Sequence, residues 1–228
     1  MGLVVTTESR RNIRDLASLI AGAISFHPWD ALNPAALHGI AARSRRRPLE
    51  FTAETGCGGS TILLSHLSQR HTAFALEGAD LTVSELKRRD DLLADRVEFI
   101  EGETRLTLPV YQFLSKLDLL LLDGPHAYPL PQIEFAYLFP HLKTGGWLVL
   151  DDLQIPSVYE LFKFVKSSSE VVLEEVVGRT AFFRRTQPGR HVVGNPDGWW
   201  LQQMNRSLVW RYSWRDRLRK LFRPRAKN

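Results

Sequence analysis

The chain has 228 residues, 44% of them hydrophobic and 24% charged, which fits one folded domain with an extension and excludes disordered and fibrous classes. Its one cysteine, Cys57, excludes an intrachain disulfide and a zinc site built from several cysteines. The apolar runs are far shorter than the roughly 18 residues that span a bilayer, and the first residues do not resemble a secretion signal. We therefore expect a cytoplasmic location.

The net charge of +5 is unevenly distributed along the chain. From Thr186 onward there are ten basic and two acidic residues, whereas the preceding part holds 20 basic and 23 acidic residues. A mildly acidic body argues against nucleic acid as a partner, because such binding needs a basic excess on the binding face. The basic character belongs to the C-terminal extension.

In chain order, the hydrophobic spacing first predicts two helices, over 8–24 and 35–43. Strands are then predicted at 49–53, 72–76, 97–100, 117–122 and 147–150. Helices are predicted after them, at 61–68, 81–93, 132–142 and 157–166, and the glycine pair at 145–146 is expected to stop the third of these. Two further strands, 171–177 and 180–185, are separated only by Gly178 and Arg179, and so short a linker permits only an antiparallel hairpin.

Five strand-then-helix units with apolar strands predict an α/β fold, in which a mostly parallel sheet is covered by helices on both faces. With the terminal hairpin the sheet would have seven strands. We divide the chain into an N-terminal helical cap (1–48), a central domain (49–186) and a basic, aromatic C-terminal extension (187–228).

Acidic residues recur where the predicted strands end. They are Glu54, Glu77, Glu103, Asp123, Asp151 and Asp152. The carboxyl ends of parallel strands meet at one edge of an open sheet, where ligands bind. Carboxylates gathered there repel one another, and a cationic ligand or a metal ion would relieve that repulsion.

The first candidate site is the loop Glu54-Thr55-Gly56-Cys57-Gly58-Gly59-Ser60. Gly56 and Gly58 allow a tight turn and a close approach of the backbone to a ligand. Glu77 lies 23 residues after Glu54, at the end of the next strand, where an acid suits two ribose hydroxyls. A nicotinamide cofactor is disfavoured, because Glu54 precedes the loop that would hold a pyrophosphate and because a dehydrogenase sheet lacks the terminal hairpin.

The order of these motifs resembles that of class I S-adenosylmethionine-dependent methyltransferases, of the small-molecule and sugar O-methyltransferase type. The motifs are E-x-G-x-G-x-S, E-G-E-T, D-G-x-H, K-x-G-G and a strand ending in D-D, between residues 49 and 185. The resemblance implies a seven-stranded Rossmann-like sheet and S-adenosylmethionine as cofactor. It places the methionine part at Glu54, Gly56, Gly58 and Ser60, the ribose at Glu77 and the adenine near Glu103 and Thr104.

The second candidate site comprises Asp123, Asp151 and Asp152, which end neighbouring strands. Their oxygens suit Mg²⁺ or another divalent cation, and metal-dependent O-methyltransferases of the catechol type carry acids at these three places. Such an ion would lower the pKa of a substrate hydroxyl and orient it. The structural alternative is that Asp152 caps the next helix and Asp123 only orders its loop.

His126 lies three residues after Asp123, where catechol-type enzymes carry a lysine base. We expect His126 and Asp123 to be catalytic, with His126 accepting a hydroxyl proton. His126 could instead bind the metal or hydrogen-bond its loop. The other histidines have no comparable setting and are interpreted as structural: His27, His38, His66, His71, His141 and His191.

Three functions stay open. The first is metal-assisted O-methylation of a hydroxyl on a small molecule or sugar. The second is a metal-independent methyltransferase with His126 as base. The third is a methyltransferase-like body whose basic tail binds a membrane or polyanion, although that tail could equally pack on its own domain or on a second subunit in a homodimer.

Overall fold

The computed structural model describes residues 18, 32–76, 83–187, 205–207, 210, 211 and 213–215. Within them seven strands form one sheet in the order β3-β2-β1-β4-β5-β7-β6. The strands are β1 (Leu49–Thr55), β2 (Ser68–Ala75), β3 (Val97–Glu101), β4 (Leu117–Leu122), β5 (Leu142–Leu150), β6 (Val171–Val177) and β7 (Thr180–Arg185). The helices are α2 (Pro34–Arg46), α3 (Gly59–Leu67), α4 (Val83–Lys87), α5 (Thr104–Thr107), α6 (Leu130–Leu138) and α7 (Pro156–Lys166), with short 3-10 turns η1 (Ala94–Arg96) and η2 (Phe139–His141).

The first five strands pair in parallel, whereas β7 pairs antiparallel with both β5 and β6. This arrangement confirms the predicted α/β sheet with a C-terminal hairpin. The predicted helix over 8–24 lies outside the described residues, Ser18 apart. No helix in the described part of the chain has the length and apolar character needed to cross a membrane.

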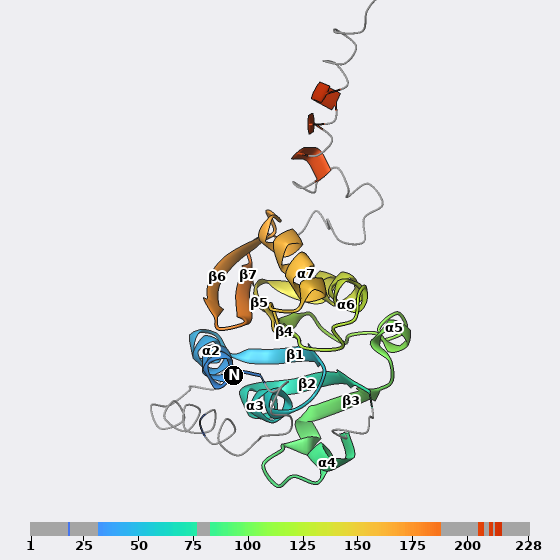
Figure 1. Ribbon diagram of the computed structural model, residues 1–228. Helices are drawn as coiled ribbons and strands as arrows, with labels where there is room; N and C mark the ends of the chain where they lie inside the picture. The colour runs from blue at the N-terminus through green and yellow to red at the C-terminus, as the bar shows by residue number, and fades with distance from the viewer. Residues whose placement is uncertain are drawn as a thin grey trace, which may run out of the picture.

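The alternation of side chains along the central strands divides the core into two layers. Leu119 and Leu121 of β4 pack with α2 and α3, whereas Leu120 and Leu122 pack with α6 and α7. The two helix layers accordingly cover opposite faces of the sheet (Figure 1). Because both faces of β4 are covered, all six of its residues are buried, Asp118 included.

Two predicted helices end four or more residues earlier than expected. The helix expected over 81–93 is only α4 within the described residues, because Arg89 donates to Asp91 two residues on, and such a pair stabilises a turn and not a helix. The helix expected over 132–142 ends at Leu138, ahead of Pro140. The expected glycine stop lies inside β5, where Gly145 adopts a φ of +80° beside the irregular pairing of β4 with β5.

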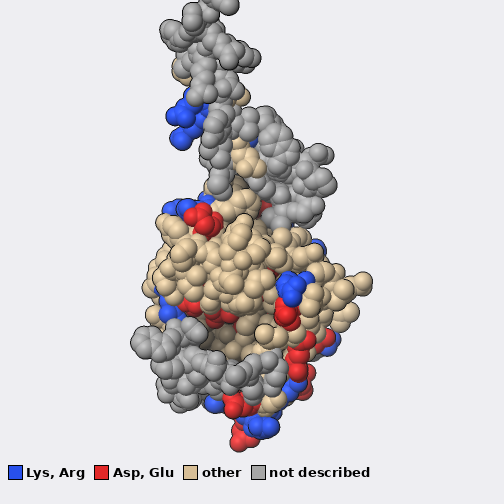
Figure 2. All heavy atoms as spheres, turned by 45° about the vertical axis from the view of Figure 1, so that its right-hand side comes forward, with Lys and Arg blue, Asp and Glu red and all other residues tan. Residues whose placement is uncertain are grey.

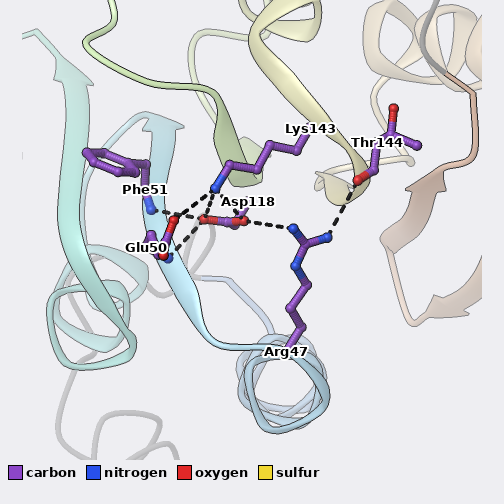
Figure 3. Close-up of polar contacts among 6 residues, drawn as sticks. All are labelled: Arg47, Glu50, Phe51, Asp118, Lys143 and Thr144. Atoms are coloured by element: carbon purple, nitrogen blue, oxygen red, sulfur yellow. Dashed lines mark hydrogen bonds and ion pairs between the residues drawn. The ribbon is translucent and has the colours of Figure 1, made fainter. Parts of the chain in front are cut away.

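The amino ends of three central strands are joined by Asp118 of β4 (Figure 3). Its Oδ2 accepts hydrogen bonds from the backbone N–H groups of Glu50, at 2.9 Å, and Phe51, at 3.1 Å, on β1. Lys143 of β5 donates to the same carboxylate at 3.0 Å, and a nitrogen of Arg47 lies 3.7 Å from it. These bonds fix β1, β4 and β5 relative to one another and so help align their carboxyl ends at the opposite rim.

Candidate functional site

The residues that follow β1, β4 and β5 lie level with one another at the carboxyl rim. Gly56 N–H donates to the carbonyl of Phe74, Asp123 N–H to Thr55 and Asp151 N–H to Leu122. The strand ends therefore deliver the glycine loop and the two acidic loops to the same place. Figure 2 turns the right-hand side of Figure 1 forward and shows acidic atoms within a hollow that lies next to a broad area of uncharged residues.

The acidic cluster is formed by Asp123, His126 and Asp152. One ligand atom from each of these residues lies within 4.8 Å of the other two. The Nε2 atom of His126 is 3.2 Å from Oδ2 of Asp152, which is 1% exposed. The structure thus brings together three of the four side chains predicted for the metal and for proton transfer.

The fourth residue, Asp151, is fully buried beside the cluster. Thr180 donates to its Oδ1, and its Oδ2 accepts no hydrogen bond from the described residues. Burial raises the pKa of Asp151, and the charge of Asp152 adds to this effect, while the hydrogen bond from Thr180 opposes it. The buried carboxylates therefore disfavour one another's charge, as expected where a cation is bound during function.

Burial and neighbouring negative charges act more strongly on Asp123 than on Asp151. Burial raises its pKa well above the usual value, and the charges of Asp151, Asp152 and Glu54 raise it further. Asp152 also has a φ of +60°, and among the described residues it is the one non-glycine with positive φ. Aspartate tolerates this conformation better than most residues, and strain of this kind is concentrated at functional sites.

Arg179, at the tip of the β6–β7 hairpin, contributes a positive charge to the cluster. Its Nε lies 3.0 Å from Asp152 Oδ1 and 4.0 Å from Asp151 Oδ2. The backbone fixes this approach, because Leu153 N–H donates to the carbonyl of Arg179. Asp152 Oδ1 also accepts from Gln154. Sequence reasoning did not select Arg179, although its place between β6 and β7 predicts that it lies at this rim.

The residues of the cluster fit a hard divalent cation. Asp123 and Asp152 present carboxylate oxygens, His126 presents a ring nitrogen, and the buried Oδ2 of Asp151 has no hydrogen-bond donor among the described residues. Two or three carboxylates with room for water suit Mg²⁺ or Mn²⁺.

The glycine loop lies directly against the start of the Asp123 loop. Gly56 has a φ of +85°, and a Cβ there would lie 2.2 Å from the carbonyl oxygen of Asp123. Gly58 differs, because a Cβ there would meet no atom of the described residues within 4 Å. Ser60 is buried in the first turn of α3. Only glycine fits at Gly56, and Gly58 leaves room for a ligand.

Glu54 is fully buried beneath this loop. Its Oε1 accepts a hydrogen bond from Thr61 and lies 3.0 Å from Nε2 of His71 on β2. Its Oε2 has no hydrogen-bond partner in the described part of the chain. The interpretation of His71 as an ordinary histidine missed this contact. The pairing of β1 with β2 could have indicated the contact between His71 and Glu54, because Thr52 is opposite His71 and Glu54 is two residues further along β1.

The remaining predicted cofactor residues are less closely grouped. Glu103 precedes α5, is about half exposed and pairs with Arg105. Thr104 is buried next to it. Glu77 lies outside the described residues. The contacts predicted for ribose and adenine therefore stay predictions.

Comparisons with known proteins bear on both the fold and the loops at the carboxyl rim. A family described as "Methyltransferase domain" matches residues 53–153, which run from the glycine loop to the acid pair after β5. Over these residues the chain is similar to class I S-adenosylmethionine-dependent methyltransferases. Mycinamicin III 3''-O-methyltransferase of Micromonospora griseorubida is 32% identical to it over 95 residues, which cover 42% of this chain but only 37% of that relative.

Solved structures share this methyltransferase fold at low sequence identity. A putative O-methyltransferase from Klebsiella pneumoniae aligns with a TM-score of 0.60 and 12% identity over 81% of this chain and 93% of its own. TomG of Streptomyces achromogenes, an O-methyltransferase in complex with SAM, has a TM-score of 0.55, 18% identity and coverage of 77% and 90%. The MycE methyltransferase in complex with Mg, SAH and mycinamycin VI has a TM-score of 0.53, 18% identity and coverage of 81% and 57%.

Proposed function

We propose that this methyltransferase transfers a methyl group from S-adenosylmethionine to a hydroxyl of a small molecule or sugar, with a divalent cation at the acidic cluster. The observation that carries the proposal is the meeting of the glycine loop and the acidic cluster at one rim, with Asp123 in contact range of both. The curated relative, which is named for O-methylation, supports the choice of a hydroxyl acceptor. The Mg in the MycE complex supports the choice of a cation.

The residues of the chain divide the work of such a transfer. The glycine loop would hold the donor, because Gly58 leaves open space beside the backbone and Glu54 offers a buried oxygen without a partner. Asp123, Asp151 and Asp152 would hold the cation. When bound, that ion supplies positive charge that makes a neighbouring hydroxyl more acidic.

His126 is placed to receive the proton. In the proposed transfer the acceptor oxygen bonds to the methyl carbon, the carbon–sulfur bond breaks and the hydroxyl proton passes to His126. Asp152, 3.2 Å from the ring, would stabilise the imidazolium that results. Fixing acceptor and donor at one rim removes much of the entropic barrier to an in-line displacement.

A metal-independent transfer is the second candidate, and Arg179 favours it. Its guanidinium already supplies positive charge to Asp152 and Asp151, so these acids have a counter-charge within the chain. In that case His126 alone would remove the proton.

The test combines binding with turnover. Calorimetry with S-adenosylhomocysteine measures donor-site affinity, and transfer of labelled methyl groups to a panel of glycosides and catechols measures activity, each with and without EDTA. We expect turnover that EDTA abolishes and Mg²⁺ restores, and loss of activity in Asp151→Asn but not in the exposed control Asp95→Asn. Full activity in EDTA with loss in His126→Ala would favour the metal-independent mechanism, and absence of S-adenosylhomocysteine binding would refute the function.

The predicted domain limits and the roles of both ends also enter as proposals. We assign transfer to 49–186 and substrate covering to the N-terminal cap, of which α2 is described. In the C-terminal extension, Trp210 and Trp214 are exposed and their rings lie 6.3 Å apart. Contact of this extension with a membrane or with a second subunit stays a prediction.

A further inference from the structure

A buried series of hydrogen bonds links α3, β1 and β2 underneath the glycine loop. Ser68 donates to the carbonyl of Leu64 at 2.7 Å, and Thr52 donates to Ser68 at 3.0 Å. The Thr52 hydroxyl lies 2.9 Å from Nδ1 of His71, whose Nε2 lies 3.0 Å from Oε1 of Glu54. The side chains of His71 and Glu54 are at most 1% exposed, so water does not compete for these bonds.

The proton positions in this series follow from the chemistry of each group. A carbonyl only accepts, so the hydroxyl proton of Ser68 points to Leu64 and Ser68 accepts from Thr52. Thr52 has then used its only proton and must accept from His71. The Nδ1 atom of His71 therefore carries a proton.

A second proton must lie between His71 and Glu54. A bare Nε2 facing an ionised carboxylate at 3.0 Å would set two lone pairs against each other in a dry interior, which is strongly unfavourable. The pair is therefore either imidazolium with carboxylate or imidazole with carboxylic acid, and both arrangements are neutral overall. The partner of Glu54 is thus a buried histidine of the neighbouring strand.

The pairing also divides the two oxygens of Glu54 between two tasks. Oε1 is held by His71 and by Thr61, whose hydroxyl in turn accepts from Gly58 N–H at 2.8 Å at the start of the loop. Oε2 is left as the oxygen without a partner among the described residues. We propose that His71 is a positioning residue for the methyl donor: it anchors Oε1 so that Oε2 stays available, beneath the glycine loop, to the cationic methionine end of S-adenosylmethionine. This inference rests on the proposed function, which places the donor there.

The first test reads the protons directly. Long-range proton–nitrogen NMR spectra of ¹⁵N-labelled protein distinguish a protonated from a bare ring nitrogen, and the signals that disappear in His71→Gln assign the residue. We expect Nδ1 of His71 to be protonated at neutral pH. A bare Nδ1 overturns the proposed hydrogen-bond series, and this readout does not depend on any ligand.

The second test is a double-mutant cycle on donor-site affinity, measured by calorimetry with S-adenosylhomocysteine. We expect His71→Leu to weaken binding by about tenfold or more, in line with the loss of a hydrogen bond to a charged group. His71→Gln, which keeps an amide donor near the Nε2 position, should recover most of this loss. In the Glu54→Gln background His71→Leu should cost little further, because its effect runs through Glu54.

The control is His66→Leu, at the far end of α3, where the ring contacts the backbone carbonyl of Asp91. It should leave affinity unchanged, and thermal unfolding of each variant separates loss of fold from loss of affinity. If His71→Leu and Glu54→Gln lower the affinity additively, or if a folded His71→Leu variant keeps full affinity, the role of His71 is overturned. The proposed function would stand in either case. If the wild-type protein does not bind S-adenosylhomocysteine, the proposed function fails and the role of His71 fails with it.

Discussion

Two glycines of the same loop allow the donor site to be separated from the stability of the fold. Gly56→Ala places a Cβ 2.2 Å from the carbonyl oxygen of Asp123, at a φ of +85°. Gly58→Ala adds the same methyl group at a φ of 169°, in extended backbone, where no described atom lies within 4 Å. The two variants therefore differ in local geometry and not in chemistry.

The magnitudes follow from that geometry. Holding alanine in the left-handed region costs about 1–2 kcal/mol, and relieving a contact with a backbone oxygen that cannot rotate away costs about 1–3 kcal/mol more. Gly56→Ala should thus lower the unfolding free energy by roughly 2–5 kcal/mol and the melting temperature by about 4 °C or more. Gly58→Ala should change stability by no more than about 1 kcal/mol.

Gly58→Ala should affect the affinity for the donor and not the stability of the fold. A methyl group in the space proposed for the donor should weaken binding of S-adenosylhomocysteine by about tenfold or more in Gly58→Ala, although this variant should fold as wild type. Urea unfolding and calorimetry measure the two quantities. Unchanged affinity in Gly58→Ala would refute the assignment of the loop, and normal stability in Gly56→Ala would refute the close approach to Asp123.

Three further predictions concern charge. Burial raises the pKa of Glu134 from 4.5 to about 7, against a hydrogen bond from Thr55. Between these two pH values the carboxyl is therefore ionised in the unfolded state but still protonated in the folded state. The unfolding free energy should therefore fall by about 3 kcal/mol as pH rises through this window, and Glu134→Gln should abolish that slope in urea titrations; an unchanged slope would contradict the assignment. Arg179→Gln should bind Mn²⁺ about tenfold more tightly than the wild type in calorimetry, because a competing cation is removed from Asp152. The control Arg184→Gln should leave Mn²⁺ affinity unchanged. Unchanged or weaker binding in Arg179→Gln would contradict the prediction. Asp118→Asn should lower the unfolding free energy by about 2–4 kcal/mol, because Lys143 and two backbone donors would be left poorly paired. Glu160→Gln, which removes an exposed ion pair, is the control and should leave stability unchanged. Equal stability of the two variants would argue against the role of Asp118.

The sequence predicts well those elements whose pattern is local. The apolar run 117–122 and the two strands around Gly178 and Arg179 match β4, β6 and β7 in their bounds. Both signals are strong because a strand buried on both faces is apolar at nearly every position, here all but Asp118, and because a two-residue linker leaves one geometry. Helix ends are less well predicted, since the short pair of Arg89 with Asp91 competes with a helix that the apolar spacing alone would favour.

The site is predicted in part for a similar reason. Acids at strand ends converge in any parallel sheet, so Asp123 and Asp152 could be placed together from their positions alone. The specific contacts of His71 and Arg179 are harder to predict, because their partners are far away in the sequence and the contacts depend on strand register and on the bend of a hairpin. The same register gives Glu54 an internal partner, which composition does not reveal.

The most direct test of the account is a crystal structure of the full chain grown with S-adenosylhomocysteine and Mn²⁺, with data collected to record the anomalous signal of manganese. The account predicts the nucleoside product along the loop at Gly56 and Gly58 and an anomalous peak bonded to oxygens of Asp123 and Asp152. S-adenosylhomocysteine bound away from this loop, or manganese bound elsewhere while the acids stay paired with Arg179, would contradict it.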